Sequence, residues 1–162
     1  MTIEAAKQAM QDGRLSDARR HLEALTDSTE VGPEIHYNLA MVLARLGDFT
    51  AAAARFEHCA RQAPGNPDIL NNLGNALRLS GQHGKAGQVL DRAIRTTPGH
   101  PALRCKRGLL KLASGSPEAA AEDFRATLAH DDSLEDASHG LTSALLAAGD
   151  SERAGELAAS AL

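Results

Sequence analysis

The chain repeats a pattern of residues every 34 positions, and this period constrains its fold more than any other feature. The clearest copy spans residues 67–100. One glycine recurs at the same position of every copy, namely Gly13, Gly47, Gly81, Gly115 and Gly149. With 14 glycines in 162 residues, four preset positions would all be glycine by chance only about 6 times in 100,000. The period therefore predicts a repeat protein in which each copy packs mainly on its neighbours.

Each copy has the pattern of two helices joined by a turn at the recurring glycine, which allows the left-handed backbone that ends a helix. Three copies begin with a proline suited to the first turn of a helix, namely Pro33, Pro67 and Pro101. Ser16, or a residue beside it, is expected to cap the second helix of the first copy. The second helices share one large apolar position, which is occupied by Leu22, Phe56, Leu90 and Phe124. The sequence thus predicts a single all-α array of five repeats, at about residues 1–32, 33–66, 67–100, 101–134 and 135–162.

Small residues recur where the helices are expected to meet. They are Ala40, Gly74 and Gly108 in the first helices, and Ala52, Ala86 and Ala120 in the second helices. Small side chains let two helices approach until their ridges interlock. A leucine at any of these positions is expected to overpack the interface.

The third copy resembles the tetratricopeptide repeat in its order of large and small residues. The residues that carry the resemblance are Leu73, Gly74, Leu77, Gly81, Ala86, Leu90, Ala93 and Pro98. The second and third repeats match almost everywhere, and the other three match in part. The resemblance implies a right-handed α-solenoid, with a concave groove lined by the first helix of each repeat. It also implies a non-enzymatic protein–protein interaction scaffold that binds a peptide or partner segment in that groove.

Helix geometry selects the residues that should point into the groove, because they lie one or two positions away from the apolar stripe of each first helix. The predicted partner-binding residues are Tyr37, Asn38, Met41, Arg45, Asn71, Asn72, Asn75, Arg78 and Lys106, with Cys105, Leu109, His139 and Ser143 as further candidates. Asn38, Asn72 and Lys106 occupy the same repeat position and are expected to form a ladder. An asparagine amide can both donate to and accept from a peptide backbone. The alternative is that asparagine stands at this position only as a solvated polar residue.

Basic residues cluster in the fourth repeat, and a positive strip there would suit a ligand with carboxylates or a free C-terminus. The cluster comprises Arg104, Lys106, Arg107 and Lys111, to which Arg45 and Arg78 could add. For Arg107 and Lys111 the sequence favours another interpretation, in which their stems cover the core and their charges extend into water. Lys106 is expected to face the groove.

Composition argues against several classes of function. The net charge of −4 gives no general attraction to nucleic acid or to an anionic membrane. Neither a membrane-spanning run nor the apolar core of a secretory signal is expected in the chain. Cys59, Cys105 and the seven histidines show no metal-ligand spacing. We therefore expect a bacterial, cytoplasmic protein with buried thiols, no active site and no cofactor.

The last repeat leaves two alternatives open beside the plain scaffold. Arrays of this family commonly close with an extra polar helix, and none follows the fifth repeat, so Leu157 and Leu162 should leave an apolar edge uncovered. The edge could form a contact between copies of the chain. Alternatively, the array could recruit substrate for a following enzyme domain. In bacterial arrays that the sequence resembles, such a domain is a glycosyltransferase, sulfotransferase or 2-oxoglutarate-dependent oxygenase.

Overall fold

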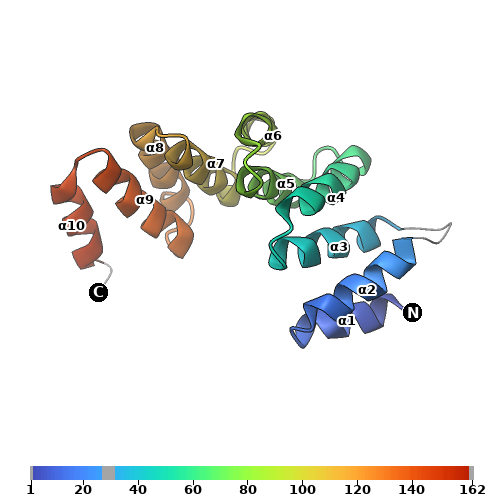
Figure 1. Cartoon of the computed structure of the whole chain (residues 1–162). Helices are drawn as coiled ribbons and strands as arrows, with labels where there is room; N and C mark the ends of the chain where they lie inside the picture. Colours follow the sequence, from blue (N-terminus) through green and yellow to red (C-terminus); the bar gives the residue numbers. More distant parts are fainter. Residues whose placement is uncertain (1, 27–31, 161–162) are drawn as a thin grey trace. The chain divides into compact units, whose positions relative to one another are not determined.

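The computed structural model describes residues 2–26 and 32–160, and within this part the chain forms ten α-helices and no strand (Figure 1). The first five helices are α1 (Ile3–Gln11), α2 (Leu15–Thr26), α3 (Pro33–Arg45), α4 (Phe49–Gln62) and α5 (Pro67–Leu79). The other five are α6 (His83–Thr96), α7 (Pro101–Ala113), α8 (Pro117–Leu128), α9 (Glu135–Ala147) and α10 (Ser151–Ser160). The prediction of an all-α chain with two helices in each repeat is confirmed.

The turn within each repeat is built on the recurring glycine, as the sequence predicts. The φ angles are positive at all five, with values of 74° at Gly13, 84° at Gly47, 79° at Gly81, 76° at Gly115 and 83° at Gly149. This left-handed conformation strains any residue that carries a Cβ atom, which explains why glycine recurs at this position.

The helix starts agree with the sequence at the prolines but not at Ser16. Pro33, Pro67 and Pro101 each open a first helix, where the missing N–H has no partner to lose. By contrast, α2 already begins at Leu15, so Ser16 and the residues on either side of it lie inside the helix, and the predicted cap is wrong. Asp48 caps α4 by accepting a hydrogen bond of 3.1 Å from the backbone of Ala51.

The chain divides into two compact units, Met1–Gln82 and His83–Leu162, and the division falls between the two helices of the third repeat. In the first unit each helix from α1 to α5 packs against the next one along the chain (Figure 1). Its core contains the predicted apolar residues of both helix types, among them Leu22, Leu39, Leu43, Phe56, Leu73 and Leu77. Packing of these side chains positions the surface that α3, α4 and α5 share.

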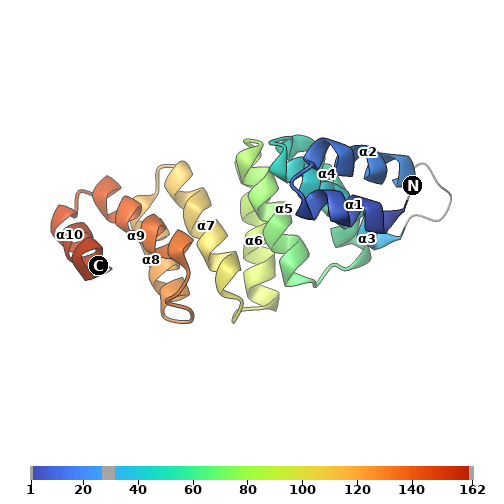
Figure 2. The same ribbon diagram turned by 90° about the horizontal axis from the view of Figure 1, so that it is seen from below.

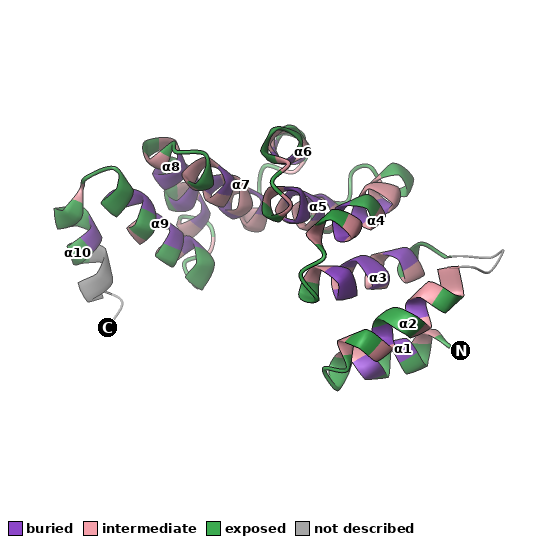
Figure 3. Cartoon of the chain, in the orientation of Figure 1, coloured by how far each residue is buried: buried purple, intermediate pink, exposed green. Residues whose placement is uncertain are grey.

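In the second unit α6 to α10 pack in the same sequential manner, and α7 also contacts α9 (Figure 2). Buried residues run along α7, α8 and α9 (Figure 3). They include Phe124 on α8, whose ring lies close to two glycines of the neighbouring helices. A Cβ atom added at Gly140 would lie 2.5 Å from this ring, and one added at Gly108 would lie 2.8 Å from it. These distances confirm the prediction that small residues at the helix interface allow close approach.

The predicted apolar edge falls at the limit of the described structure. Leu162 lies outside the described residues, and the described side chains of α10 end before Leu157. The contact between copies of the chain therefore stays a prediction. None of the helices in the described residues has the length and apolar character needed to cross a membrane.

Candidate functional site

A pocket of about 400 Å³ opens where the N-terminal ends of α3 and α5 meet the C-terminal end of α4. Its lining residues are Pro33, Glu34, Tyr37, Cys59, Gln62, Ala63, Asn66, Asp68 and Ile69. We call it the acidic pocket, because Glu34 and Asp68 are the charged residues among the described residues that line it. Its volume falls within the range of about 300–1,000 Å³ that is usual for ligand pockets.

A second pocket, of about 290 Å³, lies on the same three helices, further along α3 and α5. Its lining residues are Met41, Ala44, Arg45, Phe49, Phe56, Asn72, Asn75, Ala76 and Leu79. We call it the Arg45 pocket, after the charged residue among those lining residues. The two pockets therefore present opposite charges on one surface of the first unit.

A hydrogen bond between α3 and α5 separates the two pockets. Asn72 donates to the hydroxyl of Tyr37 at 2.9 Å, and its amide nitrogen also lies 3.7 Å from the sulfur of Met41. The Tyr37 ring is held in turn by Phe56, edge to face, with ring centroids 5.7 Å apart. Tyr37 lines the acidic pocket and Asn72 lines the Arg45 pocket, so this bond forms part of the wall of both.

The Tyr37 hydroxyl lies in a partly buried environment close to the carboxylate of Asp68. Burial and the nearby carboxylate of Asp68 raise the pKa of Tyr37, and the hydrogen bond from Asn72 only partly offsets them. Burial also raises the pKa of the Cys59 thiol. Both groups therefore stay protonated at neutral pH, and the pocket offers no activated nucleophile.

The remaining predicted groove residues of the first unit are either hydrogen-bonded within the protein or partly covered by it. Arg45 donates to the backbone carbonyl of Met10 at 3.1 Å and so ties α3 to the end of α1. Arg78 donates to Asn75 at 2.9 Å. The side chains of Asn38 and Asn71 are half-buried. The Asn38 amide nitrogen is inaccessible to solvent and has no hydrogen-bond partner within the described residues.

The predicted ladder is therefore not a row of equivalent exposed amides. Asn38 has a covered donor, and Asn72 uses its donor to hold Tyr37. Lys106 belongs to the second unit, where its ammonium group lies 3.2 Å from Asp136 on α9. Whether these residues bind a partner stays a prediction, but Asn72 also has a structural role that the sequence did not reveal.

Cys105 does not face a groove, contrary to the prediction. It is buried in the core of the second unit with Phe124 and Leu141, while Leu109 packs partly against that core. The prediction assumed that α7 buries the same positions as α5. With charged residues at 107 and 111, α7 instead buries Leu103 and Cys105 on its inner side. His139 and Ser143 are exposed on α9.

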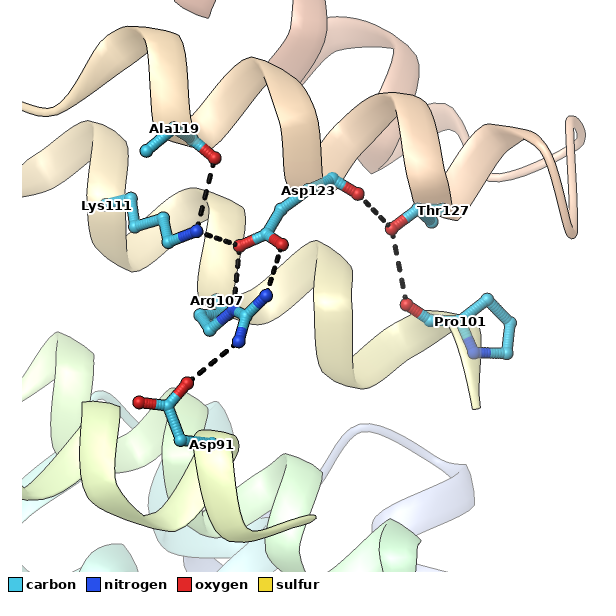
Figure 4. A network of polar contacts seen from close by, with 7 residues as sticks. All are labelled: Asp91, Pro101, Arg107, Lys111, Ala119, Asp123 and Thr127. Carbon is cyan, nitrogen blue, oxygen red and sulfur yellow. Dashed lines mark hydrogen bonds and ion pairs between the residues drawn. The ribbon is translucent and has the colours of Figure 1, made fainter. Parts of the chain in front are cut away.

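The charges of Arg107 and Lys111 are not extended into water, so that prediction is also wrong (Figure 4). Arg107 binds Asp123 with two hydrogen bonds, of 2.8 and 2.6 Å, and donates to Asp91 at 2.8 Å. Lys111 lies 2.9 Å from Asp123 and also donates to the carbonyl of Ala119. The Asp123 side chain is only 4% exposed, so a buried carboxylate draws both cations inward.

This ion-pair network joins three successive helices, α6 through Asp91, α7 through Arg107 and α8 through Asp123 (Figure 4). Burial alone would raise the pKa of Asp123, but hydrogen bonds from Arg107 and Lys111 outweigh burial and lower it. The hydrogen bonds that Arg107 donates to Asp123 and Asp91 raise the pKa of its guanidinium group. Every charge in the network is compensated within the fold, so we interpret it as structural.

The structure brings together no metal-ligating group of three or more histidine, cysteine or acidic side chains in the described parts of the chain. Cys59 and Cys105 are free and buried. The rings of His36 and His58 contact each other at a tilt of 43°, with centroids 4.1 Å apart, and the His58 ring is hydrogen-bonded to Gln62 rather than to a thiol. The geometry thus offers pockets and polar walls, which are features of a binding surface.

Sequence reasoning missed the acidic pocket, although a signal for it was present. Glu34 and Asp68 are one period apart and follow Pro33 and Pro67, and Asp136 falls at the same repeat position. A recurring acidic residue in the first turn of a first helix could have marked the pocket. The prediction considered only those positions of the first helices that should face the groove, and it did not include the C-terminal end of α4.

A repeating array of helix pairs is the class of protein that this fold defines. The sequence model of the tetratricopeptide repeat matches residues 3–67 and 105–162, and a second such model matches residues 43–105. The chain therefore belongs to the tetratricopeptide repeat family, and its fold class is the α-solenoid. No curated protein sequence matches the chain.

Solved structures show the same fold. MamA from Desulfovibrio magneticus RS-1 aligns with a TM-score of 0.82 and 20% identity, over 97% of this chain and 89% of the other. A thermophilic tetratricopeptide repeat protein from Thermus thermophilus aligns with a TM-score of 0.78 and 25% identity, over 99% of this chain and 88% of the other. At such identity the likeness to MamA establishes the fold alone.

Proposed function

We propose that the chain is a non-enzymatic protein–protein interaction scaffold that binds a segment of a partner protein on the shared surface of α3, α4 and α5. The observation that carries this proposal is the pair of pockets divided by the Tyr37–Asn72 hydrogen bond. Two adjacent pockets suit neighbouring side chains of one extended segment. Membership of the tetratricopeptide repeat family supports the same class of function.

The surface is largely preformed, which favours binding. Tyr37 is fixed by Asn72 and Phe56, and Arg45 is fixed by Met10. Because these side chains are already ordered, little conformational entropy is lost on the protein's side when a partner binds. The free, buried cysteines are consistent with the cytoplasmic location that we propose.

Selection from a random peptide library displayed on phage tests this function even though the natural partner is unidentified. We expect selected peptides to bind the wild-type chain. In fluorescence anisotropy they should bind Asn38→Ala/Asn72→Ala about tenfold more weakly, because loss of the hydrogen bond that positions Tyr37 removes about 1.4 kcal/mol of binding free energy. Gln88→Ala, an exposed amide on α6, serves as the control. Unchanged affinity in the double variant, at unchanged helix content, would overturn the proposal.

A further inference from the structure

Two histidine rings meet where α3 packs against α4. His36 on α3 and His58 on α4 have ring centroids 4.1 Å apart, with the rings tilted by 43°. His36 is only 9% exposed, and its Nδ1 atom is covered and finds no hydrogen-bond partner in the described parts of the chain. Both ring nitrogens of a charged imidazole are donors. Protonation of His36 would therefore place a charge, and an N–H group without an acceptor, inside the interface.

The surroundings of His58 also suit a neutral ring. Its Nδ1 atom lies 3.4 Å from the Nη2 atom of Arg61, one turn further along α4. A guanidinium group can only donate hydrogen bonds, so this contact requires a His58 Nδ1 atom that carries no proton. Protonation of His58 would remove that acceptor and place two cations beside each other.

The charged groups around His36 do not compensate a positive charge on its ring. Burial lowers the pKa of His36 most, and His58 and Arg55, both on α4, lower it further. None of the carboxylates on the described helices α1–α5 raises it, namely Glu4 on α1, Asp17 and Glu23 on α2, Glu34 on α3, Glu57 on α4 and Asp68 on α5. The interface therefore accepts the neutral histidines and opposes the charged ones.

The histidine contact lies at the end of the α3–α4 interface that forms the acidic pocket. Tyr37 follows His36 in the chain, Cys59 follows His58, and both of these residues line the pocket. Cys59 is 2% exposed, and its sulfur lies 4.0 Å from the carbonyl oxygen of Pro33 on α3. A wider spacing between α3 and α4 would therefore change the pocket and uncover the Cys59 thiol.

We propose that the contact between His36 and His58 is a pH-sensitive switch in the first unit. While both rings are neutral, this end of α3 stays packed on α4. Uptake of a proton by either ring opens the interface locally at the acidic pocket, while the rest of the unit stays folded. If the proposed function holds, the switch makes one side of the binding surface dependent on pH.

The two cysteines report on the switch without any ligand. Cys59 lies at the α3–α4 interface, whereas Cys105 is buried in the core of the second unit and serves as the internal reference. Both thiols are labelled with dithiodipyridine at pH 7.5 and at pH 5.5, and mass spectrometry after digestion gives the rate at each cysteine. Division by the rate of glutathione at the same pH removes the effect of thiol ionisation.

The corrected rate at Cys59 should be several-fold higher at pH 5.5 than at pH 7.5. The increase should reach about tenfold at most, because one exposed imidazole with an ordinary pKa near 6.5 is about tenfold more protonated than neutral at pH 5.5. The corrected rate at Cys105 should not change, and circular dichroism should show the same helix content at both pH values.

Histidine variants make the test specific. His36→Leu introduces the residue that the third repeat has at this position, the buried Leu70, and Cys59 should then react at the same corrected rate at both pH values. His58→Gln keeps a polar side chain that cannot take up a proton, and it should reduce the increase even if His36→Leu fails to fold. His130→Leu removes an exposed histidine of the second unit and should behave as wild type.

A Cys59 rate that does not increase at pH 5.5, or that increases equally in wild type, His36→Leu and His58→Gln, would overturn the inference. An equal increase at Cys105, or a loss of helix content, would also overturn it, because either result indicates general unfolding instead of local opening. Since the labelling uses no peptide, the switch can be confirmed even if the proposed function fails. Equally, a peptide that binds the α3–α5 surface would not rescue the switch if the labelling rates stay the same.

Discussion

Arg107 on α7 and Asp123 on α8 form a bidentate ion pair, with N–O distances of 2.8 and 2.6 Å, in which the carboxylate is almost fully buried. The pair occupies an interface that the preceding repeat fills with leucine, because Arg107 corresponds to Leu73. A buried carboxylate is tolerated here because both of its oxygens are bound by cations.

Arg107→Met should lower the free energy of unfolding by about 3 kcal/mol, because Asp123 then keeps only Lys111 as a charged partner. Urea unfolding followed by circular dichroism measures the effect. Arg92→Met, on the exposed side of α6, is the control and should change stability by less than about 0.5 kcal/mol. A loss no larger than that of the control would contradict the account of the network.

Replacing the whole ionic cluster should be far less costly than breaking it. Arg107→Leu/Lys111→Leu/Asp123→Val introduces the residues that the third repeat has at these positions, namely Leu73, Leu77 and Val89. Apolar replacement of a buried ion pair is often neutral or stabilising, so we expect stability at least equal to wild type. A triple variant as unstable as Arg107→Met would show that α7 does not accept the apolar pattern.

Gly140→Ala should destabilise the second unit by about 2 kcal/mol, because its Cβ atom would lie 2.5 Å from the ring of Phe124. Gly87→Ala is the matched control, since its Cβ atom would meet Leu110 at an ordinary 3.7 Å. The control should gain stability from the better helix propensity of alanine. Thermal unfolding of the two variants measures both effects. If Gly140→Ala were as stable as wild type, the ring of Phe124 would have to move aside at no cost.

Stability should fall as the pH is lowered through the ordinary range of histidine, because His36 is buried. Burial, and then the nearby His58 and Arg55, lower the pKa of His36 in the folded chain. His36 therefore binds a proton more readily in the unfolded chain than in the folded chain. The contribution of neutral His36 to the stability of the fold is complete above about pH 6.5 and is lost as the pH falls below it. Between pH 7.5 and 5.5, the free energy of unfolding should fall less for His36→Leu than for wild type. The exposed His130→Leu variant should behave as wild type, and identical pH dependence in all three proteins would contradict the assignment.

Self-association through the last helix stays a separate prediction, which light scattering over a range of concentrations tests. If Leu157 and Leu162 form a contact between copies, the wild-type chain should be larger than a monomer and Leu157→Glu/Leu162→Glu should be monomeric. Leu146→Glu changes a leucine on α9 that is 55% exposed and should leave the mass unchanged. A monomeric wild-type chain at all concentrations would argue against this contact.

Much of the fold follows from the sequence because the repeat imposes the same local requirements five times. Glycine at the turn and a large apolar residue opposite small ones each have one physical explanation, and the structure confirms them at Gly81, Phe124 and Gly108. The register of α7 could not be predicted in the same way. In α7, Arg107 and Lys111 reach across to Asp123 on α8, and Cys105 is buried instead. Asp123 lies 16 residues beyond Arg107 in the sequence, so its place beside α7 depends on how the two helices pack.

The candidate site was predictable only residue by residue. Helix geometry selected Tyr37, Met41 and Asn72, but not the hydrogen bond that joins two of them across α3 and α5. The acidic pocket combines ends of three helices, and such a combination depends on tertiary packing rather than on the period of any one helix.

The most direct test of the proposed function is to map the binding site of a selected peptide by NMR. We expect saturable changes in the backbone signals of Tyr37, Met41, Ile69 and Asn72, with the signals of α8 and α9 unchanged. The same peptide should give much smaller changes with Asn38→Ala/Asn72→Ala. Changes confined to α7–α10, or equal changes in wild type and the double variant, would contradict the claim that the α3–α5 surface binds the partner.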